Sequence, residues 1–79
     1  MTTTELKFQW HPATNTDQRI ARDSGYDLWV FPYTGTYGYQ VKYKGIEIAM
    51  STKPNMDLAK SEAERVANTD KRQRENGIK

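Results

Sequence analysis

The chain has 79 residues, of which 35% are hydrophobic and 28% charged, and its formal net charge is +2. This length allows one small domain with a thin core and excludes a multidomain protein. The absence of cysteine excludes a disulfide and fits a reducing compartment. The N-terminal MTTTE lacks the features of a signal peptide, and no apolar run approaches the ~20 residues that span a bilayer. We therefore expect a cytoplasmic protein with no membrane partner.

Alternating apolar and polar side chains predict a first strand over residues 6–10, with Leu6, Phe8 and Trp10 on its buried side. The strand is expected to stop at His11-Pro12, because proline removes a hydrogen-bond donor from the ladder. The polar stretch 13–17 is expected to be a loop. Residues 1–4 are expected to form a flexible N-terminus.

A hairpin is predicted next, with a strand from Gln18 to Arg22 and a three-residue turn at Asp23-Ser24-Gly25. Glycine in the left-handed position is typical of the last residue of such a turn. With this turn, Arg22 would lie opposite Tyr26, and Ile20 opposite Leu28.

The strand Tyr26 to Pro32 is apolar on both of its faces. Alternation places Tyr26, Leu28 and Val30 on one face, and Trp29 and Phe31 on the other. The following stretch, 33–38, contains two glycines and two tyrosines. We expect it to be a loop of some length.

The central prediction is a hairpin from Tyr39 to Met50 with a two-residue turn at Lys44-Gly45. Directly opposed residues share a face of a sheet, so this turn would gather six apolar side chains on the core face. The expected opposed pairs are Tyr43 with Ile46, Val41 with Ile48, and Tyr39 with Met50.

A helix is predicted from Met56, with Asn55 as its N-cap and Asp57 favourable to the helix dipole. Its apolar residues fall within an arc of roughly 100°, the width of a core-facing stripe. The stripe ends at Ala67, so the buried part should stop there. Residues 71–79 are expected to form a flexible charged tail.

These elements predict a single α+β domain over residues 1–79. It would consist of a small antiparallel sheet of about four to five strands, connected as a meander, with one C-terminal helix packed on one face.

No arrangement of residues predicts an enzyme. The one histidine, His11, lies at a strand end, and neither a thiol nor a serine with a neighbouring base is present. Scattered carboxylates lack the spacing of zinc ligands. We expect no catalytic residue, no metal and no cofactor.

Aromatic residues give the first candidate binding site. The helix can cover only one face of the sheet, so Trp29 and Phe31 would point away from it. Large apolar patches on small monomers usually serve binding. The alternative is that Leu6, Phe8 and Trp10 fold over Trp29 and Phe31 as a second core. The predicted partner-binding residues are Trp29, Phe31, Tyr33 and Tyr37.

Basic residues give the second candidate, a nucleic-acid surface. Arg65 and Arg72 are seven residues apart and would share a helix face if the helix continued. Acidic residues are interspersed, which favours an ordinary solvated surface. The candidate residues are Gln40, Lys42, Lys44, Arg65 and Arg72.

The pattern from Trp29 to Ala67 is an aromatic strand, a Gly-Tyr-x-Val-x-Tyr-x-Gly hairpin and an alanine-lined helix. It resembles the arm-binding domains of phage integrases and the AP2-type modules, which read DNA with the exposed face of the sheet. This resemblance implies Trp29, Gln40, Lys42 and Lys44 as readers. Those families line this face with arginines, however, and the hairpin has none.

The chain is also similar in type to small phage-encoded inhibitors, including anti-CRISPR proteins and inhibitors of host polymerases, which act by occlusion. This likeness predicts a non-enzymatic phage or mobile-element protein that blocks a host defence or nucleic-acid-processing complex through protein–protein contact. It would act in the host cytoplasm as a monomer or weak homodimer. DNA binding by the sheet is the alternative function.

Overall fold

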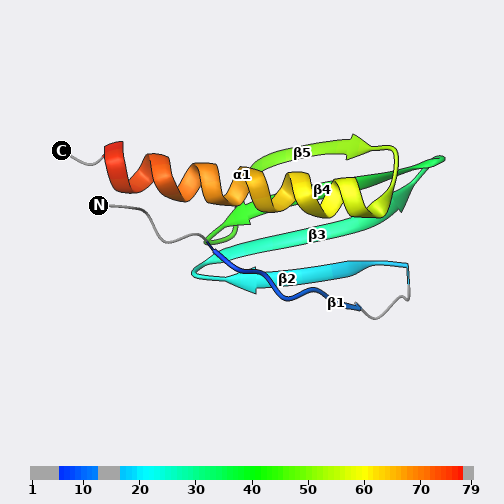
Figure 1. Cartoon of the computed structure of the whole chain (residues 1–79), viewed down its shortest axis with the longest axis horizontal. Helices are drawn as coiled ribbons and strands as arrows, with labels where there is room; N and C mark the ends of the chain where they lie inside the picture. The colour runs from blue at the N-terminus through cyan, green and yellow to red at the C-terminus, as the bar shows by residue number, and fades with distance from the viewer. Residues whose placement is uncertain (1–5, 13–16, 78–79) are drawn as a thin grey trace.

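The computed structural model of the chain describes residues 6–12 and 17–77. It shows a five-stranded antiparallel sheet in the order β1-β2-β3-β4-β5, followed by one helix (Figure 1). The predicted α+β class is confirmed. The N-terminus 1–4 and most of the loop 13–17 lie outside the described residues. The elements are β1 His11–Pro12, β2 Arg19–Asp23, β3 Tyr26–Tyr33, β4 Thr36–Tyr43, β5 Ile46–Lys53 and α1 Met56–Gly77.

Three tight turns connect the last four strands, and each consists of one residue followed by glycine. Both residues of every turn have positive φ, for example 51° at Lys44 and 85° at Gly45. Such turns match the right-handed twist of the strands they join. The long loop expected over 33–38 is therefore wrong, because β3 and β4 extend into it. The turns are Ser24-Gly25, Thr34-Gly35 and Lys44-Gly45.

The first of these turns changes the register between β2 and β3 by one residue. Ala21 lies opposite Leu28, and Ile20 lies opposite Trp29. The expected pairing of Ile20 with Leu28 is wrong, because the turn has two residues instead of three. As a result Ala21 is buried in the core, at 1% exposure, and Ile20 joins the opposite face of the sheet.

A β-bulge alters the central hairpin. Tyr43 lies opposite Ile46, as predicted, but Val41 then lies opposite Ala49 and Gln40 opposite Met50. The extra residue in β5 moves every later side chain of this strand to the other face. The expected pairings of Val41 with Ile48 and of Tyr39 with Met50 are therefore wrong. Met50 and Ile46 are 55% and 70% exposed and lie outside the core.

Helix α1 packs across one face of the sheet, which we call the inner face (Figure 1). Its three buried alanines have no exposed surface, and their small side chains bring the helix backbone close to β3 and β4. The asparagine N-cap is present, since the Leu58 N–H donates to Asn55 Oδ1 at 2.9 Å. The buried residues are Ala21, Tyr26, Leu28, Val30, Tyr39, Val41, Ala59, Ala63 and Ala67.

The N-terminal segment packs against the same core, beside the helix. The Leu6 N–H donates to Asn68 Oδ1 at 2.6 Å, and the Trp10 indole donates to Glu64 Oε2 at 2.6 Å. Leu6, Phe8 and Trp10 alternate in burial as predicted, although regular pairing begins only at β1. Because this segment is tied to the helix, it does not form a second core over Trp29 and Phe31.

Helix α1 continues ten residues beyond Ala67. Asp70, the next residue on the stripe, accepts a hydrogen bond from the Tyr26 hydroxyl at 2.7 Å and one from Arg74 Nε at 2.5 Å. The Arg74 guanidinium also lies 4.2 Å from the Tyr43 ring centre. Burial, reinforced by Asp70, raises the pKa of Tyr26, so its hydroxyl remains a donor. Residues 71–77, where a flexible charged tail is expected, form the last part of this helix.

Substitution of Val41 tests the inner face. Val41 has no exposed surface, so Val41→Ala should lower the free energy of unfolding by about 2–3 kcal/mol through lost burial and a cavity. Ile46→Ala removes a larger but exposed side chain and should change the free energy of unfolding by less than about 1 kcal/mol. Urea denaturation of both variants measures the difference, and equal losses would contradict the assignment of faces.

We expect the hydrogen bond between Asp70 and Tyr26 to hold the second half of the helix against the sheet. Asp70→Ala leaves the buried Tyr26 hydroxyl without its acceptor and should cost about 1–3 kcal/mol in thermal or urea unfolding. Glu75→Ala, which removes the exposed partner of Lys71 one turn further on, should cost no more than about 0.5 kcal/mol. If Asp70→Ala unfolded as the Glu75 variant does, the helix end would not depend on this contact.

Candidate binding surface

The face of the sheet opposite the helix, which we call the outer face, carries three rings in a row along β3. Trp29, Phe31 and Tyr33 alternate with core residues, so all three point away from α1. The registers of the neighbouring strands place Ile20 and Met50 in the same row as Trp29. We call these five residues, Ile20, Trp29, Phe31, Tyr33 and Met50, the outer patch.

The rings of the outer patch contact one another in series. The Trp29 and Phe31 ring centres are 4.3 Å apart with planes tilted by 37°, and those of Phe31 and Tyr33 are 6.5 Å apart and edge to face. The Trp29 indole N–H donates to Gln18 Oε1 at 3.1 Å, which ties the ring to the residue just before β2. Tyr33 is 56% exposed. Such stacking orders the three rings relative to one another.

Gly38 makes room for the middle ring. It lies opposite Phe31 on β4, and a Cβ added there would be 2.5 Å from the Phe31 ring. The ring therefore lies across β4, and Gly38 is buried beneath it. Beside it, a largely apolar hollow of about 160 Å³ is lined by Phe31, Tyr33, Met50, Ser51 and Thr52.

A row of alternating charges crosses the outer face beside the outer patch. From β2 to β5 its members are opposed in turn, and we call them the charged row: Arg22, Asp27, Lys42 and Glu47. Arg22 Nε is 2.8 Å from Asp27 Oδ1, and Gln40 Nε2 donates to Glu47 Oε1 at 2.8 Å. Each basic side chain thus has an acidic neighbour, so the row has no net charge.

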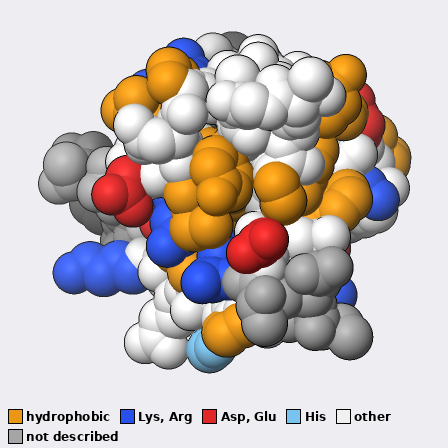
Figure 2. Space-filling model, turned by 90° about the vertical axis from the view of Figure 1, so that its right-hand side faces the viewer, with side chains coloured by type: hydrophobic (Ala, Val, Ile, Leu, Met, Phe, Trp, Pro, Cys, Tyr) orange, Lys and Arg blue, Asp and Glu red, His pale blue; other side chains and the backbone are white. Residues whose placement is uncertain are grey.

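Tyr37, the fourth predicted partner-binding residue, lies on the inner side of the sheet. It is opposed to Pro32 and Lys53 and packs against the core. It lines a hollow with Met56 and Leu58 at the start of the helix. At this end of the molecule, hydrophobic side chains form separate groups, and basic side chains lie beside acidic ones (Figure 2). The structure therefore separates Tyr37 from Trp29, Phe31 and Tyr33.

The five basic-site candidates do not form one surface. Gln40 and Lys42 lie on the outer face, and Lys44 is in the turn after β4, 5.4 Å from the Tyr43 ring centre. Arg65 and Arg72 are on the helix, so the five residues are divided between the outer face, a turn and the helix.

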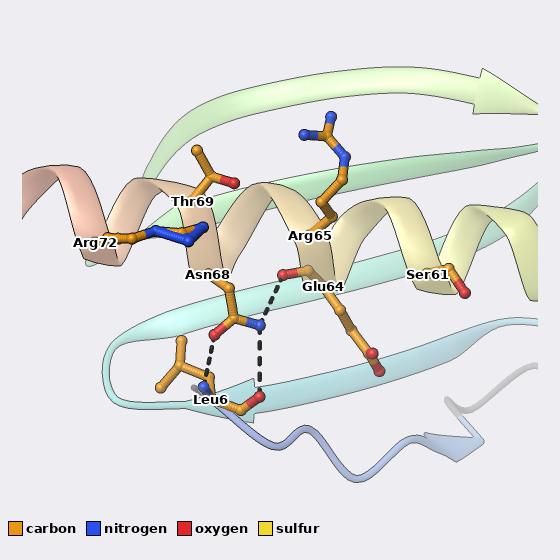
Figure 3. A pocket seen from close by; sticks show the side chains of 7 residues that line it. All are labelled: Leu6, Ser61, Glu64, Arg65, Asn68, Thr69 and Arg72. Carbon is orange, nitrogen blue, oxygen red and sulfur yellow. Dashed lines mark hydrogen bonds between the residues drawn. The ribbon is translucent and has the colours of Figure 1, made fainter. Parts of the chain in front are cut away.

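Arg65 and Arg72 line a shared groove between helix and N-terminal segment, but their side chains diverge (Figure 3). Arg72 lies along the helix beside Thr69, whereas Arg65 extends away from Leu6. Arg65 is hydrogen-bonded to Glu62, and this bond lowers the pKa of the Glu62 carboxyl. Asn68 fills the middle of the groove by bonding Leu6 and the Glu64 carbonyl. Asn68 in this groove therefore holds the N-terminal segment against the helix.

Two residues of the outer patch, Ile20 and Met50, have predicted pairings that would place them on the core face, Ile20 opposite Leu28 and Met50 opposite Tyr39. For Ile20 a signal existed, since Ser24-Gly25 can form the two-residue turn that moves it outward. For Met50 none existed, because the bulge near Ile48 has no residue signature such as a glycine.

Within residues 6–12 and 17–77, no three His, Cys, Asp or Glu side chains are grouped so that they could hold a metal ion. No helix in this described part is long and apolar enough to cross a membrane.

Comparisons of the chain with protein-family models, curated proteins and solved structures found no match.

A double-mutant cycle tests the contact between Phe31 and Gly38. Gly38→Ala should destabilise the protein more in the wild-type background than in Phe31→Ala, because only the wild type has a ring to displace. We expect a coupling free energy on the order of 0.5–1.5 kcal/mol from urea denaturation. Additive effects would show that the ring does not lie on Gly38.

Proposed function

We propose that the protein is a non-enzymatic binding protein that docks onto a partner protein through the outer patch. The observation that carries this proposal is that the helix and the described part of the N-terminal segment both pack on the inner face, so neither of them covers the rings of β3. Pre-stacked Trp and Tyr side chains are the residues most often found as energetic anchors of protein interfaces.

Charge favours a protein partner over nucleic acid for this face. Lys42 has Asp27 on one side and Glu47 on the other, and Arg22 is paired with Asp27. A surface that follows a phosphate backbone needs an excess of positive charge. A neutral row beside apolar rings instead resembles the polar rim and apolar centre of a protein interface.

In this proposal the protein acts by occlusion. It supplies a rigid sheet face, covers a functional surface of its partner and carries out no chemistry. The identification of the partner as a host complex, and of the source as a phage or mobile element, stays a prediction from the type of sequence. DNA reading by Trp29, Gln40, Lys42 and Lys44 remains the alternative.

Trp29→Ala tests the proposal. Trp29 is half-buried against Phe31 and lies outside the core, so its loss should cost the fold about 1–3 kcal/mol. It should weaken partner binding by about 2 kcal/mol or more, as for an interface anchor. The measurement compares proteins captured from a lysate by wild type and variant, followed by the affinity for the captured protein.

Leu58→Ala is the matched control, because Leu58 is 48% exposed but lies on the helix. A partner retained by this variant and lost by Trp29→Ala supports the proposal. A folded Trp29→Ala protein that binds at full strength would refute it. Nucleic-acid binding that falls steeply with salt and with Lys42→Ala would favour the DNA alternative.

A further inference from the structure

The charged row on the outer face is complementary to itself. Read from β2 to β5, the side chains of Arg22, Asp27, Lys42 and Glu47 are positive, negative, positive and negative. Read from β5 to β2, every sign is reversed. A second copy of the chain that meets this row in the opposite strand order would therefore place an opposite charge at each position.

One symmetry operation produces that meeting. Two copies can pack outer face to outer face about a two-fold axis that runs parallel to the strands, midway between β3 and β4. Each row then lies against the same row in reverse, so Arg22 faces Glu47 of the second copy and Asp27 faces its Lys42. A two-fold axis perpendicular to the strands would instead place the charged row of one copy against the end of the outer face that carries Tyr33 in the other copy, where no such row lies. Charge selects the first arrangement.

The uncharged rows fit the same arrangement. In the next row, which is Ile20, Trp29, Gln40 and Met50, the two apolar ends meet, Ile20 against Met50 of the second copy. In the row after that, Phe31 lies opposite position 38 of the second copy, where Gly38 is covered by that copy's own Phe31 ring, so the two Phe31 rings meet beside the axis. Apolar contact between the two copies in both rows thus follows from the operation that the charges select.

We propose that a second copy of this chain occupies the outer face in the free protein, forming a two-fold homodimer with the two sheets packed as a sandwich. The inference rests on the proposed function, because it uses the same surface. It adds regulation: the dimer covers the outer patch, so a heterologous partner binds only by displacing the second copy. Self-association and partner binding then compete.

The dimer should be weak. Four strands of this length present roughly 500 Å² of flat area per copy, which places the pair at the low end of specific interfaces. Arg22 and Asp27, whose side chains are 78% and 45% exposed, are within reach of a facing sheet. We expect a dissociation constant on the order of 10–100 μM for the wild type.

Charge reversal gives a test specific to this arrangement. Arg22→Glu places like charges opposite each other at both ends of the row, and so does Glu47→Arg. Each variant alone should associate at least about tenfold more weakly in sedimentation velocity. An equimolar mixture should associate again, because opposite charges then face each other at every position. Lys7→Glu, an exposed change of equal charge on the N-terminal segment, should dimerise as the wild type does.

Each other result overturns the inference. A wild type that is monomeric at about 1 mM excludes the dimer. Reversal variants that dimerise normally would place the contact elsewhere, for example along the edge of β5. A mixture that stays monomeric would show that the charged row does not face itself. Circular dichroism confirms that each variant is folded.

The two proposals fail in different ways. If the wild type is monomeric but Trp29→Ala loses its captured partner, the inference fails and the proposed function stands. If the mixture of reversal variants associates but Trp29→Ala binds the captured partner at full strength, the dimer stands and the proposed function fails.

Discussion

Three two-residue turns determine which side chains meet in this protein. Their glycines are Gly25, Gly35 and Gly45, and all of the six central residues have positive φ. Turns of this kind fix the register of the residues next to the turn, so each strand begins directly opposite its predecessor, and the bulge in β5 shifts that register further along. The buried side chains that pack against the alanines of the helix lie on the inner face, and the rings of Trp29, Phe31 and Tyr33 lie on the outer face. Both the core and the candidate binding surface follow from this geometry.

The sequence predicted the class of the fold and most of its core. Alternation along β3 separated Leu28 and Val30 from Trp29 and Phe31 correctly, because a strand has a period of two whatever its neighbours do. The alanine stripe identified the buried helix face for the same reason. Both patterns are local properties of the chain, because each depends only on whether the residue at a given position is apolar or polar.

Register and helix length could not be predicted in the same way. The bulge in β5 depends on how two whole strands fit, so Met50 carries no mark of its outward position. Asp70 interrupts an apolar stripe and suggested an end to burial, yet it binds the Tyr26 hydroxyl of a distant strand. A polar residue on a buried stripe can be an anchor when its partner lies far away in sequence. For the candidate surface, alternation placed Trp29 and Phe31 on the correct face. The face of Tyr37 depended on the length of the turn between β3 and β4, which is two residues and not a long loop.

The contact between Leu6 and Asn68 has a kinetic consequence. The strands from β2 to β5 pair only with sequence neighbours, so their hairpins close short loops and should form early. The Leu6–Asn68 hydrogen bond joins residues 62 apart and can form only after the helix has docked. The N-terminal segment should thus be the last described part of the chain to settle. In the native ensemble it should also detach first, and amide hydrogen exchange at Leu6 would report that opening well before the sheet unfolds.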